Sequence, residues 1–167
     1  MKRSSPYIII VSIIAFWCLL LILPSLLAVL GGPVSGMSEQ LYRSFSKICH
    51  QYDSRSLHLF GYKLAVCARC SAIYFGFFIG VLLSPLLKRD QFSHARYWWV
   101  LAILPMVIDV LLDFFGISQS NTSTRLSTGG FFGVLAALIL TPIIEEVLNT
   151  FTNRFQLFKG VQYESKT

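Results

Sequence analysis

Two short segments hold most of the side chains that could do chemistry. Cys49 and His50 are adjacent, and Cys67 and Cys70 form a C-x-x-C pair further along the chain. Thiolates and imidazole are ligands that zinc prefers, and a C-x-x-C pair with a distant Cys and His supplies four of them. These four residues therefore predict a metal site, with zinc as the ion best suited to it.

The ligand set has several possible forms. Neighbouring residues on a regular backbone point in different directions, so Cys49 and His50 reach one ion together only from an irregular loop. The sequence leaves open three cysteines, three cysteines with His50, or His50 with Asp109. Where one coordination position stays open, a bound water becomes a nucleophile near neutral pH. The site would then suit metal-dependent hydrolysis.

Polar residues later in the chain suggest a substrate. Carboxylates inside membrane helices are costly and usually face a bundle interior or a polar cavity, which favours a role for Asp109. Guanidinium groups bind phosphate or carboxylate through two parallel hydrogen bonds, which suits Arg69 and Arg125 to a lipid or isoprenoid phosphate. We predict Asp109, Arg125 and His50 as catalytic residues, and Arg69 and Asn121 as cofactor- or substrate-binding residues.

The same C-x-x-C pair also permits thiol redox chemistry. At the N-terminus of a helix the dipole favours thiolate and lowers the thiol pKa. Membrane oxidoreductases built from four helices use such a pair to pass electrons to a quinone, and Cys49 would be the shuttle cysteine. A second loop cysteine is missing, however, and a redox mechanism gives Asp109 and Arg125 no role.

A third interpretation is purely structural. A disulfide or a closed zinc site would tie the loop to the helices, and Asp109 with Arg125 would form a buried ion pair between two helices. The sequence therefore favours a metal site without deciding whether the protein is an enzyme.

The composition places these residues in a membrane protein. Of 167 residues, 54% are hydrophobic and 13% are charged, and the mean hydropathy is +0.64, above the range of soluble domains. Crossing a hydrocarbon core requires about 20 apolar residues, and four stretches come close to that length. We predict one all-α domain, an integral membrane four-helix bundle with spans over about 7–30, 64–87, 97–115 and 128–147 and a polar tail over 148–167.

The first connection is long and carries the Cys-His pair. Apolar residues at helical spacing predict a short helix over residues 37–48, with Ser38 as its N-cap. We expect this helix to lie on the membrane surface and to deliver Cys49 and His50 at its C-terminal end. A turn is predicted at 60–62.

Small residues in two of the spans indicate where another helix can approach closely. Gly76 and Gly80 in the second span, and Gly129 and Gly133 in the fourth, each form a small-x-x-x-small pair. Such pairs allow two membrane helices to bring their backbones together.

The number of spans fixes which segments share a membrane face. With four spans both termini lie on one side, and eight of the fourteen Lys and Arg residues fall there, which favours cytoplasmic termini. The Cys-His loop, the start of the second span, the end of the third and the start of the fourth then meet at the outer face. At about 1.5 Å per residue, Asp109 lies only some 9 Å below its helix end. One cavity is therefore predicted for the candidate residues Cys49, His50, Cys67, Cys70, Asp109, Asn121 and Arg125.

The partners follow from this placement. The net charge of +6 resides mainly in short loops and tails, and no aromatic and basic platform suggests nucleic-acid binding. We expect contact with membrane lipid and a lipid-phosphate substrate in the cell membrane. The sequence does not decide whether the protein forms a homo-oligomer, which transport through so small a bundle would require.

Several of these residues together resemble a known family. The quoted motifs are Cys49-His50-Gln51, Arg55-Ser56, Gly61, Cys67-x-Arg69-Cys70, Tyr74, Gly76, Pro105, Asp109, Asn121, Arg125, Thr128 and Gly129. In this combination, over roughly residues 48–142, the chain resembles an uncharacterised family of small prokaryotic membrane proteins, a domain of unknown function. That family often has glycine after the aspartate, where this chain has Val110. The resemblance implies a shared site and brings no activity with it.

Overall fold

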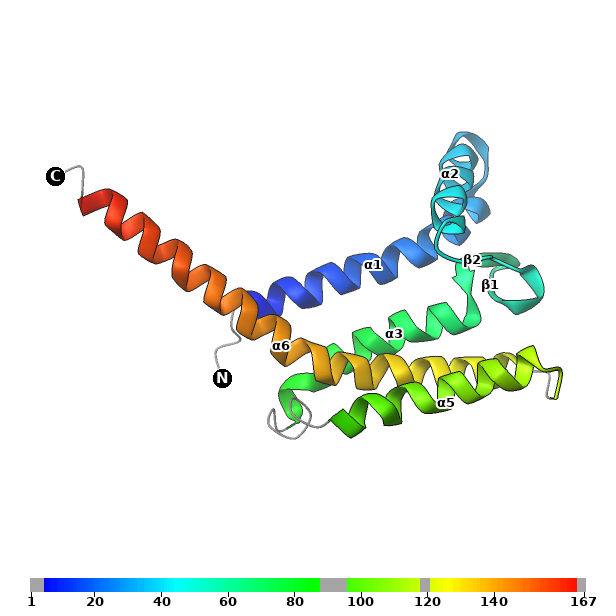
Figure 1. The fold of residues 1–167 in the computed structure, drawn as a ribbon. Helices are drawn as coiled ribbons and strands as arrows, with labels where there is room; N and C mark the ends of the chain where they lie inside the picture. The colour runs from blue at the N-terminus through cyan, green and yellow to red at the C-terminus, as the bar shows by residue number, and fades with distance from the viewer. Residues whose placement is uncertain (1–4, 88–95, 118–120, 165–167) are drawn as a thin grey trace.

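The computed structural model describes residues 5–87, 96–117 and 121–164 and is mostly helical (Figure 1). Within these ranges four helices are long and apolar enough to cross a membrane. They are α1 (Ser5–Leu30), α3 (Ala68–Leu83), α5 (Arg96–Phe114) and α6 (Thr122–Glu164). The prediction of four helices long enough to cross a membrane is therefore confirmed.

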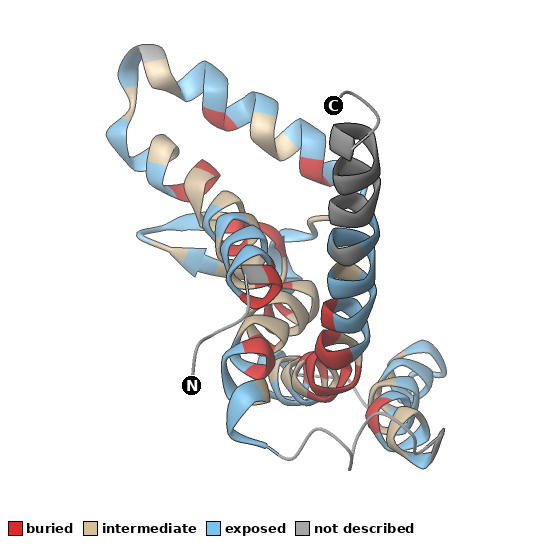
Figure 2. Cartoon of the chain, turned by 90° about the vertical axis from the view of Figure 1, so that its left-hand side faces the viewer, coloured by how far each residue is buried: buried red, intermediate tan, exposed pale blue. Residues whose placement is uncertain are grey.

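The outer surfaces of these helices are apolar. Only 6% of the apolar window of α5 is buried, and large hydrophobic side chains such as Leu104 and Ile108 are exposed. Figure 2 shows exposed residues over much of the helical surface. In lipid this is the expected arrangement, because a helix satisfies its own backbone hydrogen bonds and presents its side chains to the hydrocarbon.

Among the described elements, the most extensive contact joins α3 and α6, the two helices that carry the glycine pairs. A Cβ atom added to Gly76 would lie 2.5 Å from the carbonyl oxygen of Gly130, and one added to Gly129 would lie 2.7 Å from that of Arg69. Gly80 and Gly133 meet the facing backbone in the same way. Since side chains at these positions would hold the helices apart, the glycines fix the distance between them.

The connection between α1 and α3 departs from the all-α prediction. It comprises η1 (Gly32–Val34), α2 (Ser35–Ser46), η2 (Asp53–Arg55), and a two-stranded antiparallel sheet of β1 (Ser56–Leu59) and β2 (Tyr62–Cys67). Leu59 pairs with Tyr62, so Phe60 and Gly61 make a two-residue turn in which both φ angles are positive, 53° and 84°. This turn chemistry favours a β-hairpin.

The sheet also shifts the predicted start of the second helix. Residues 64–67 form the end of β2 and are not helical. Leu64, Ala65 and Val66 are buried against neighbouring elements, and their apolar composition made them resemble part of a membrane span. Helix α2 begins at Ser35, so Ser38 is not its N-cap; its hydroxyl instead donates to the Pro24 carbonyl at 2.8 Å.

The last helix is longer than predicted. Helix α6 begins at Thr122 and stays helical to Glu164, through the stretch that the sequence presented as a polar tail. Its span-like part covers Thr122–Thr152.

The ends of the helices gather at two opposite ends of the molecule (Figure 1). The start of α1 and the end of α6 lie toward the same end of the molecule, and the loop, the hairpin and the α5–α6 connection lie toward the other (Figure 1). Segments distant in sequence therefore meet at one rim.

Candidate functional site

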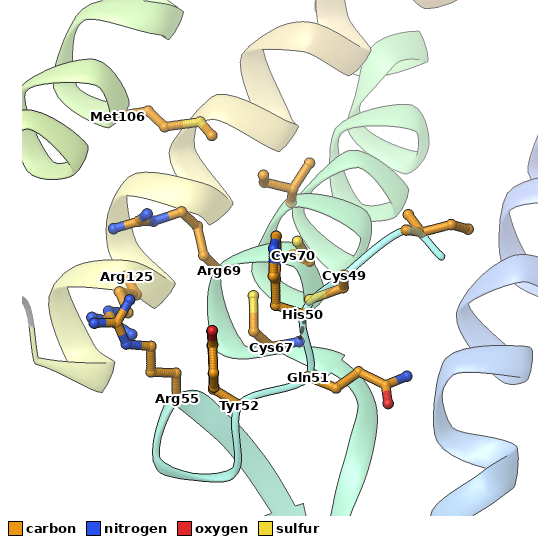
Figure 3. Close-up of a pocket in the computed structure, with 12 residues that line it drawn as sticks. Cys49, His50, Gln51, Tyr52, Arg55, Cys67, Arg69, Cys70, Met106 and Arg125 are labelled. Carbon is orange, nitrogen blue, oxygen red and sulfur yellow. Dashed lines mark hydrogen bonds between the residues drawn. The ribbon is translucent and has the colours of Figure 1, made fainter. Parts of the chain in front are cut away.

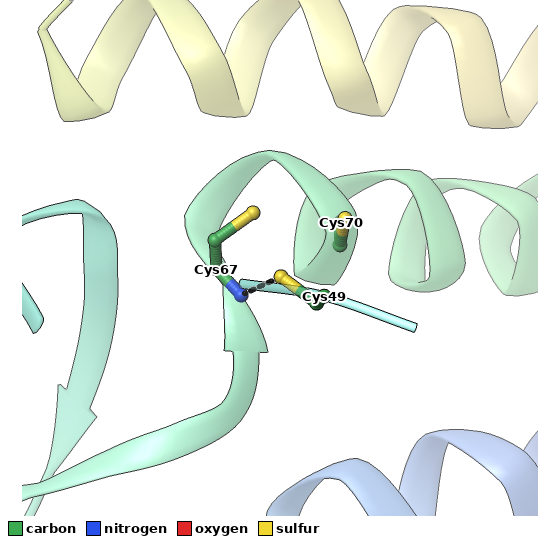
Figure 4. A group of neighbouring side chains, drawn as sticks. All are labelled: Cys49, Cys67 and Cys70. Carbon is green, nitrogen blue, oxygen red and sulfur yellow. Dashed lines mark hydrogen bonds between the residues drawn. The ribbon is translucent and has the colours of Figure 1, made fainter. Parts of the chain in front are cut away.

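Three cysteine sulfurs lie together at this rim. The Sγ atoms of Cys49, Cys67 and Cys70 are within 4.8 Å of one another, and all three thiols are free (Figure 4). Tetrahedral zinc with Zn–S bonds of about 2.3 Å requires sulfurs about 3.8 Å apart. Small side-chain rotations would close the difference, so this cluster has the spacing of a metal centre.

Each sulfur comes from a different local setting. Cys49 follows α2, and its backbone N–H bonds to the Phe45 carbonyl at 3.0 Å. Cys67 ends β2 and is the N-cap of α3, and Cys70 lies in the first turn of that helix. The backbone N–H of Cys67 donates to the Cys49 sulfur at 3.3 Å, which joins the loop to the C-x-x-C turn.

The position of Cys67 favours its thiolate. The pKa of the Cys67 thiol is lowered, first because the Cys70 thiol donates a hydrogen bond to it. The backbone N–H groups of Arg69 and Cys70 and the Cys49 side chain add to this effect, against burial, which raises the pKa. A negative sulfur at the N-terminus of a helix is also favoured by the helix dipole.

The loop that carries Cys49 is held by Gln51, whose importance the sequence did not reveal. The Gln51 side-chain amide donates to the Tyr42 carbonyl at 2.8 Å and to the Ala65 carbonyl at 2.7 Å. Lys63 Nζ donates to the Gln51 carbonyl at 3.3 Å, and Gln51 itself has a φ of 50°. One side chain thus joins the end of α2 to β2. Its place directly after the Cys-His pair was the available signal.

An apolar cluster supports this arrangement from below. Leu21 of α1, Phe45 of α2 and Val66 of β2 are buried with Cys49, and Trp17 packs edge-on to Phe45 at 5.8 Å. Because Cys49 belongs to this cluster, its sulfur is placed by packing as well as by the loop.

A cavity of about 420 Å³ opens beside the sulfurs. Its polar lining consists mainly of the three cysteines, His50, and the guanidinium groups of Arg55, Arg69 and Arg125 (Figure 3). His50 lies outside the group of sulfurs within 4.8 Å, and its exposed ring stacks on Tyr52 at 5.9 Å. Among the described residues no carboxylate lines the cavity, so its ionic lining consists of arginine side chains.

The ion pairs behind the cavity differ from the predicted pair. Asp109 pairs with Arg69, and Arg125 Nη2 lies 3.2 Å from Asp113 Oδ2. Asp109 is one turn deeper on α5 than Asp113, so it meets the first turn of α3, whereas Asp113 meets α6. The predicted Asp109–Arg125 pair is wrong for this reason. Arg69 Nε is buried without an acceptor among the described residues.

Arg55 and Asn121 have contacts that the sequence did not predict. Arg55 of η2 lies 3.6 Å from Asp113, a partner that the sequence did not predict. Asn121 is exposed immediately before α6 and does not line the cavity. Its carbonyl accepts the backbone N–H of Arg125 at 3.1 Å and the Thr124 hydroxyl at 2.8 Å, so it supports the start of the helix that carries Arg125.

Comparison with known proteins places the same residues in one family. Residues 49–139, more than half of the chain, match the family described as "Predicted membrane protein (DUF2085)". The chain belongs to the DUF2085 family. The matched range begins at Cys49 and contains the C-x-x-C pair, Asp109 and Arg125, whereas α1 and α2 precede it.

Two archaeal relatives agree with this assignment. An uncharacterized protein of Methanocaldococcus jannaschii is 36% identical over 110 residues, 65% of this chain and 70% of its own. An uncharacterized protein of Methanothermobacter thermautotrophicus is 30% identical over 104 residues, 62% of this chain and 93% of its own. No solved structure matches.

The site of this DUF2085 protein combines two chemical properties. The three sulfurs suit a soft or borderline metal ion, and the three guanidinium groups suit an anion. Both groups of side chains line a single cavity, so a metal and an anionic ligand could share it.

Proposed function

We propose that this DUF2085 protein is a zinc-binding membrane protein that acts on a lipid or isoprenoid phosphate at one membrane face. The observation that carries the proposal is the cysteine cluster, three free sulfurs within 4.8 Å of one another beside a cavity with three arginines. The sulfurs provide the metal ligands and the arginines provide the charge for a phosphate.

With the three sulfurs as ligands, His50 as the fourth would close the site, whereas a water molecule as the fourth would leave His50 free to transfer protons. Zinc with an open position supplies a Lewis acid that makes bound water nucleophilic near neutral pH. In the hydrolysis of a phosphate ester, the water oxygen bonds to phosphorus and the bond from phosphorus to the lipid oxygen breaks. The leaving alcohol takes up a proton, and His50 in the cavity is the side chain suited to transfer it.

The remaining predicted residues take supporting roles in this proposal. Arg69 and Arg125 line the cavity and bind the phosphate side of the substrate. Asp109 orients Arg69 through their ion pair, and Asn121 holds the start of the helix from which Arg125 projects. The basic residues nearer the termini favour cytoplasmic ends and a site at the outer face.

Metal analysis of purified protein tests the proposal. We expect one zinc per chain in the wild type and its loss in Cys49→Ser and Cys67→Ser. Cys18→Ser is the matched control, because Cys18 is buried within α1 and its sulfur bonds to the Tyr74 carbonyl at 3.7 Å, outside the cluster. Release of inorganic phosphate from lipid phosphates is then measured. If wild-type protein that is kept in reductant throughout its purification contains no metal, the proposal is refuted.

A second candidate function is thiol–disulfide chemistry with a quinone. The observation that favours it is Cys67 at the N-terminus of α3, with a lowered pKa and the Cys70 thiol beside it. The two thiols would become a disulfide, and their two electrons and two protons would reduce the quinone to a quinol. Metal-free protein whose thiol count falls by two for each quinol formed would favour this function over the first.

A further inference from the structure

One carboxylate behind the cavity serves two arginines from different parts of the chain. Asp113 Oδ2 on α5 lies 3.2 Å from Arg125 Nη2 of α6 and 3.6 Å from Arg55 Nη1 of η2. Both arginines line the cavity, and Asp113 is not among its lining residues. These two guanidinium groups therefore already share one anionic partner, the Asp113 carboxylate.

The two arginines are held to Asp113 unequally. The Arg125 side chain is only 9% exposed and donates hydrogen bonds to both carboxylate oxygens, at 3.2 and 3.4 Å. The Arg55 side chain is 50% exposed, and 3.6 Å is too long for a hydrogen bond. An ion pair that is too long for a hydrogen bond and has one half-exposed partner holds that partner weakly. Arg55 can therefore exchange its partner, while Arg125 keeps its own.

The cavity favours an anion with more than two oxygens. A carboxylate can satisfy one guanidinium fork, whereas the three terminal oxygens of a phosphate monoester can meet two guanidinium groups and still face the sulfur cluster. Ile48, Ile73 and Met106 also line the cavity, and they give an apolar surface for the first carbons of an attached chain. The ends of helices that cross the hydrocarbon core lie near the lipid headgroups, and the cavity lies at such ends.

We propose that Arg55 and Arg125 bind the phosphate monoester group of a lipid, and that this phosphate replaces Asp113 as the partner of Arg55. Arg55 belongs to the segment between the Cys-His pair and the hairpin, so its change of partner would hold this segment over the bound headgroup. The inference rests on the proposed function and adds to it the residues that take the phosphate and the carboxylate that competes with it.

Lipid binding to the zinc-loaded protein tests this inference. Native mass spectrometry of protein titrated with phosphatidic acid, with phosphatidylcholine as the reference lipid, measures the affinity. Inorganic phosphate is added as a competitor. We expect preference for phosphatidic acid and a roughly tenfold loss of affinity in Arg55→Gln, the usual effect of losing a charge-assisted hydrogen bond. Arg43→Gln is the matched control, because Arg43 is exposed and pairs with Glu39 on α2.

The Asp113→Asn variant distinguishes two roles of Asp113, competition with the phosphate for Arg55 or positioning of the two arginines. If phosphate replaces Asp113, removal of the negative charge strengthens phosphatidic acid binding several-fold. If Asp113 only positions the arginines, the variant weakens binding as Arg55→Gln does, and the exchange is overturned. Unchanged binding in Arg55→Gln overturns the assignment of Arg55.

The source of the phosphate and the metal proposal are tested in the same samples. Displacement of phosphatidic acid by inorganic phosphate only at high excess supports a lipid ligand, and equal affinity for the two overturns the lipid assignment. Zinc is counted in every variant. Zinc-loaded protein without phosphate binding refutes this inference alone, whereas protein without zinc refutes the proposed function.

Discussion

Gln51 shows how a single side chain can place a reactive one. Its amide donates to carbonyls of α2 and β2, two residues beyond Cys49. A carboxylate at this position would offer these two carbonyls no donor. The loop would then lose two hydrogen bonds and gain two repulsive contacts, and Cys49 would lose its fixed place beside Cys67.

We therefore expect Gln51→Glu to weaken zinc binding at least tenfold and to lower the free energy of unfolding by about 2 kcal/mol. Gln40→Glu is the control, since Gln40 is exposed on α2 and the substitution adds the same charge. Zinc affinity is measured by competition with a chelator, and stability by thermal unfolding in detergent. Equal zinc affinities in the two variants would contradict a positioning role for Gln51.

At the scale of elements, the α3–α6 contact sets the position of the C-x-x-C turn. A Cβ atom on Gly129 would come within 2.7 Å of the backbone oxygen of Arg69, one of the two residues between Cys67 and Cys70. The neighbouring Gly130 has only one contact for an added Cβ, at 3.9 Å to the Ala72 carbonyl. Two adjacent glycines thus differ sharply in the space around them.

Gly129→Ala should therefore destabilise the protein by about 1–3 kcal/mol, because overpacking forces two backbones apart. Gly130→Ala should be neutral or stabilising by up to about 1 kcal/mol, since alanine favours helix over glycine. Thermal unfolding compares the variants, and zinc content shows whether the turn has moved. A larger loss of stability in Gly130→Ala than in Gly129→Ala would contradict the packing described here.

The elements also show why some features could be predicted from the sequence and others not. Apolar length revealed the four helices, and glycine spacing marked two of them as able to pack closely against another helix. The strand at 62–67 was missed because Leu64, Ala65 and Val66 are apolar on every face and continue directly into α3. The Phe60-Gly61 turn was the only local sign of a hairpin. The Arg–Asp pairs depend on the depth at which α5 meets α3 and α6, which spacing alone does not give.

At the scale of the whole molecule, the site gathers its parts from most of the chain. The sulfurs come from the loop and the start of α3, and the arginines come from η2, α3 and α6. Connectivity of four spans was enough to predict this convergence. The supporting role of α1 was not predictable, since Trp17 and Leu21 read as ordinary members of an apolar span before their packing under Cys49 was known.

This distribution predicts how the molecule responds to loss of zinc. Zinc would join the loop at Cys49 to α3, whereas α5 and α6 contact each other independently of it. A ligand at 1,000 times its Kd stabilises the folded state by about 4 kcal/mol. A chelator should therefore lower the Tm of wild-type protein by several degrees, and hydrogen exchange should increase in residues 47–67 before it increases in α6.

Two variants make this prediction specific. Addition of chelator should lower the Tm of Cys18→Ser as much as that of the wild type, because Cys18 lies outside the cluster. Cys67→Ser should start at the lower Tm and show no response to chelator. If exchange increased equally in α6 and in the loop, zinc would stabilise the helices as a whole. The zinc site would then stabilise all the helices together. It would not be a local link between the loop and α3 that allows the cavity to open.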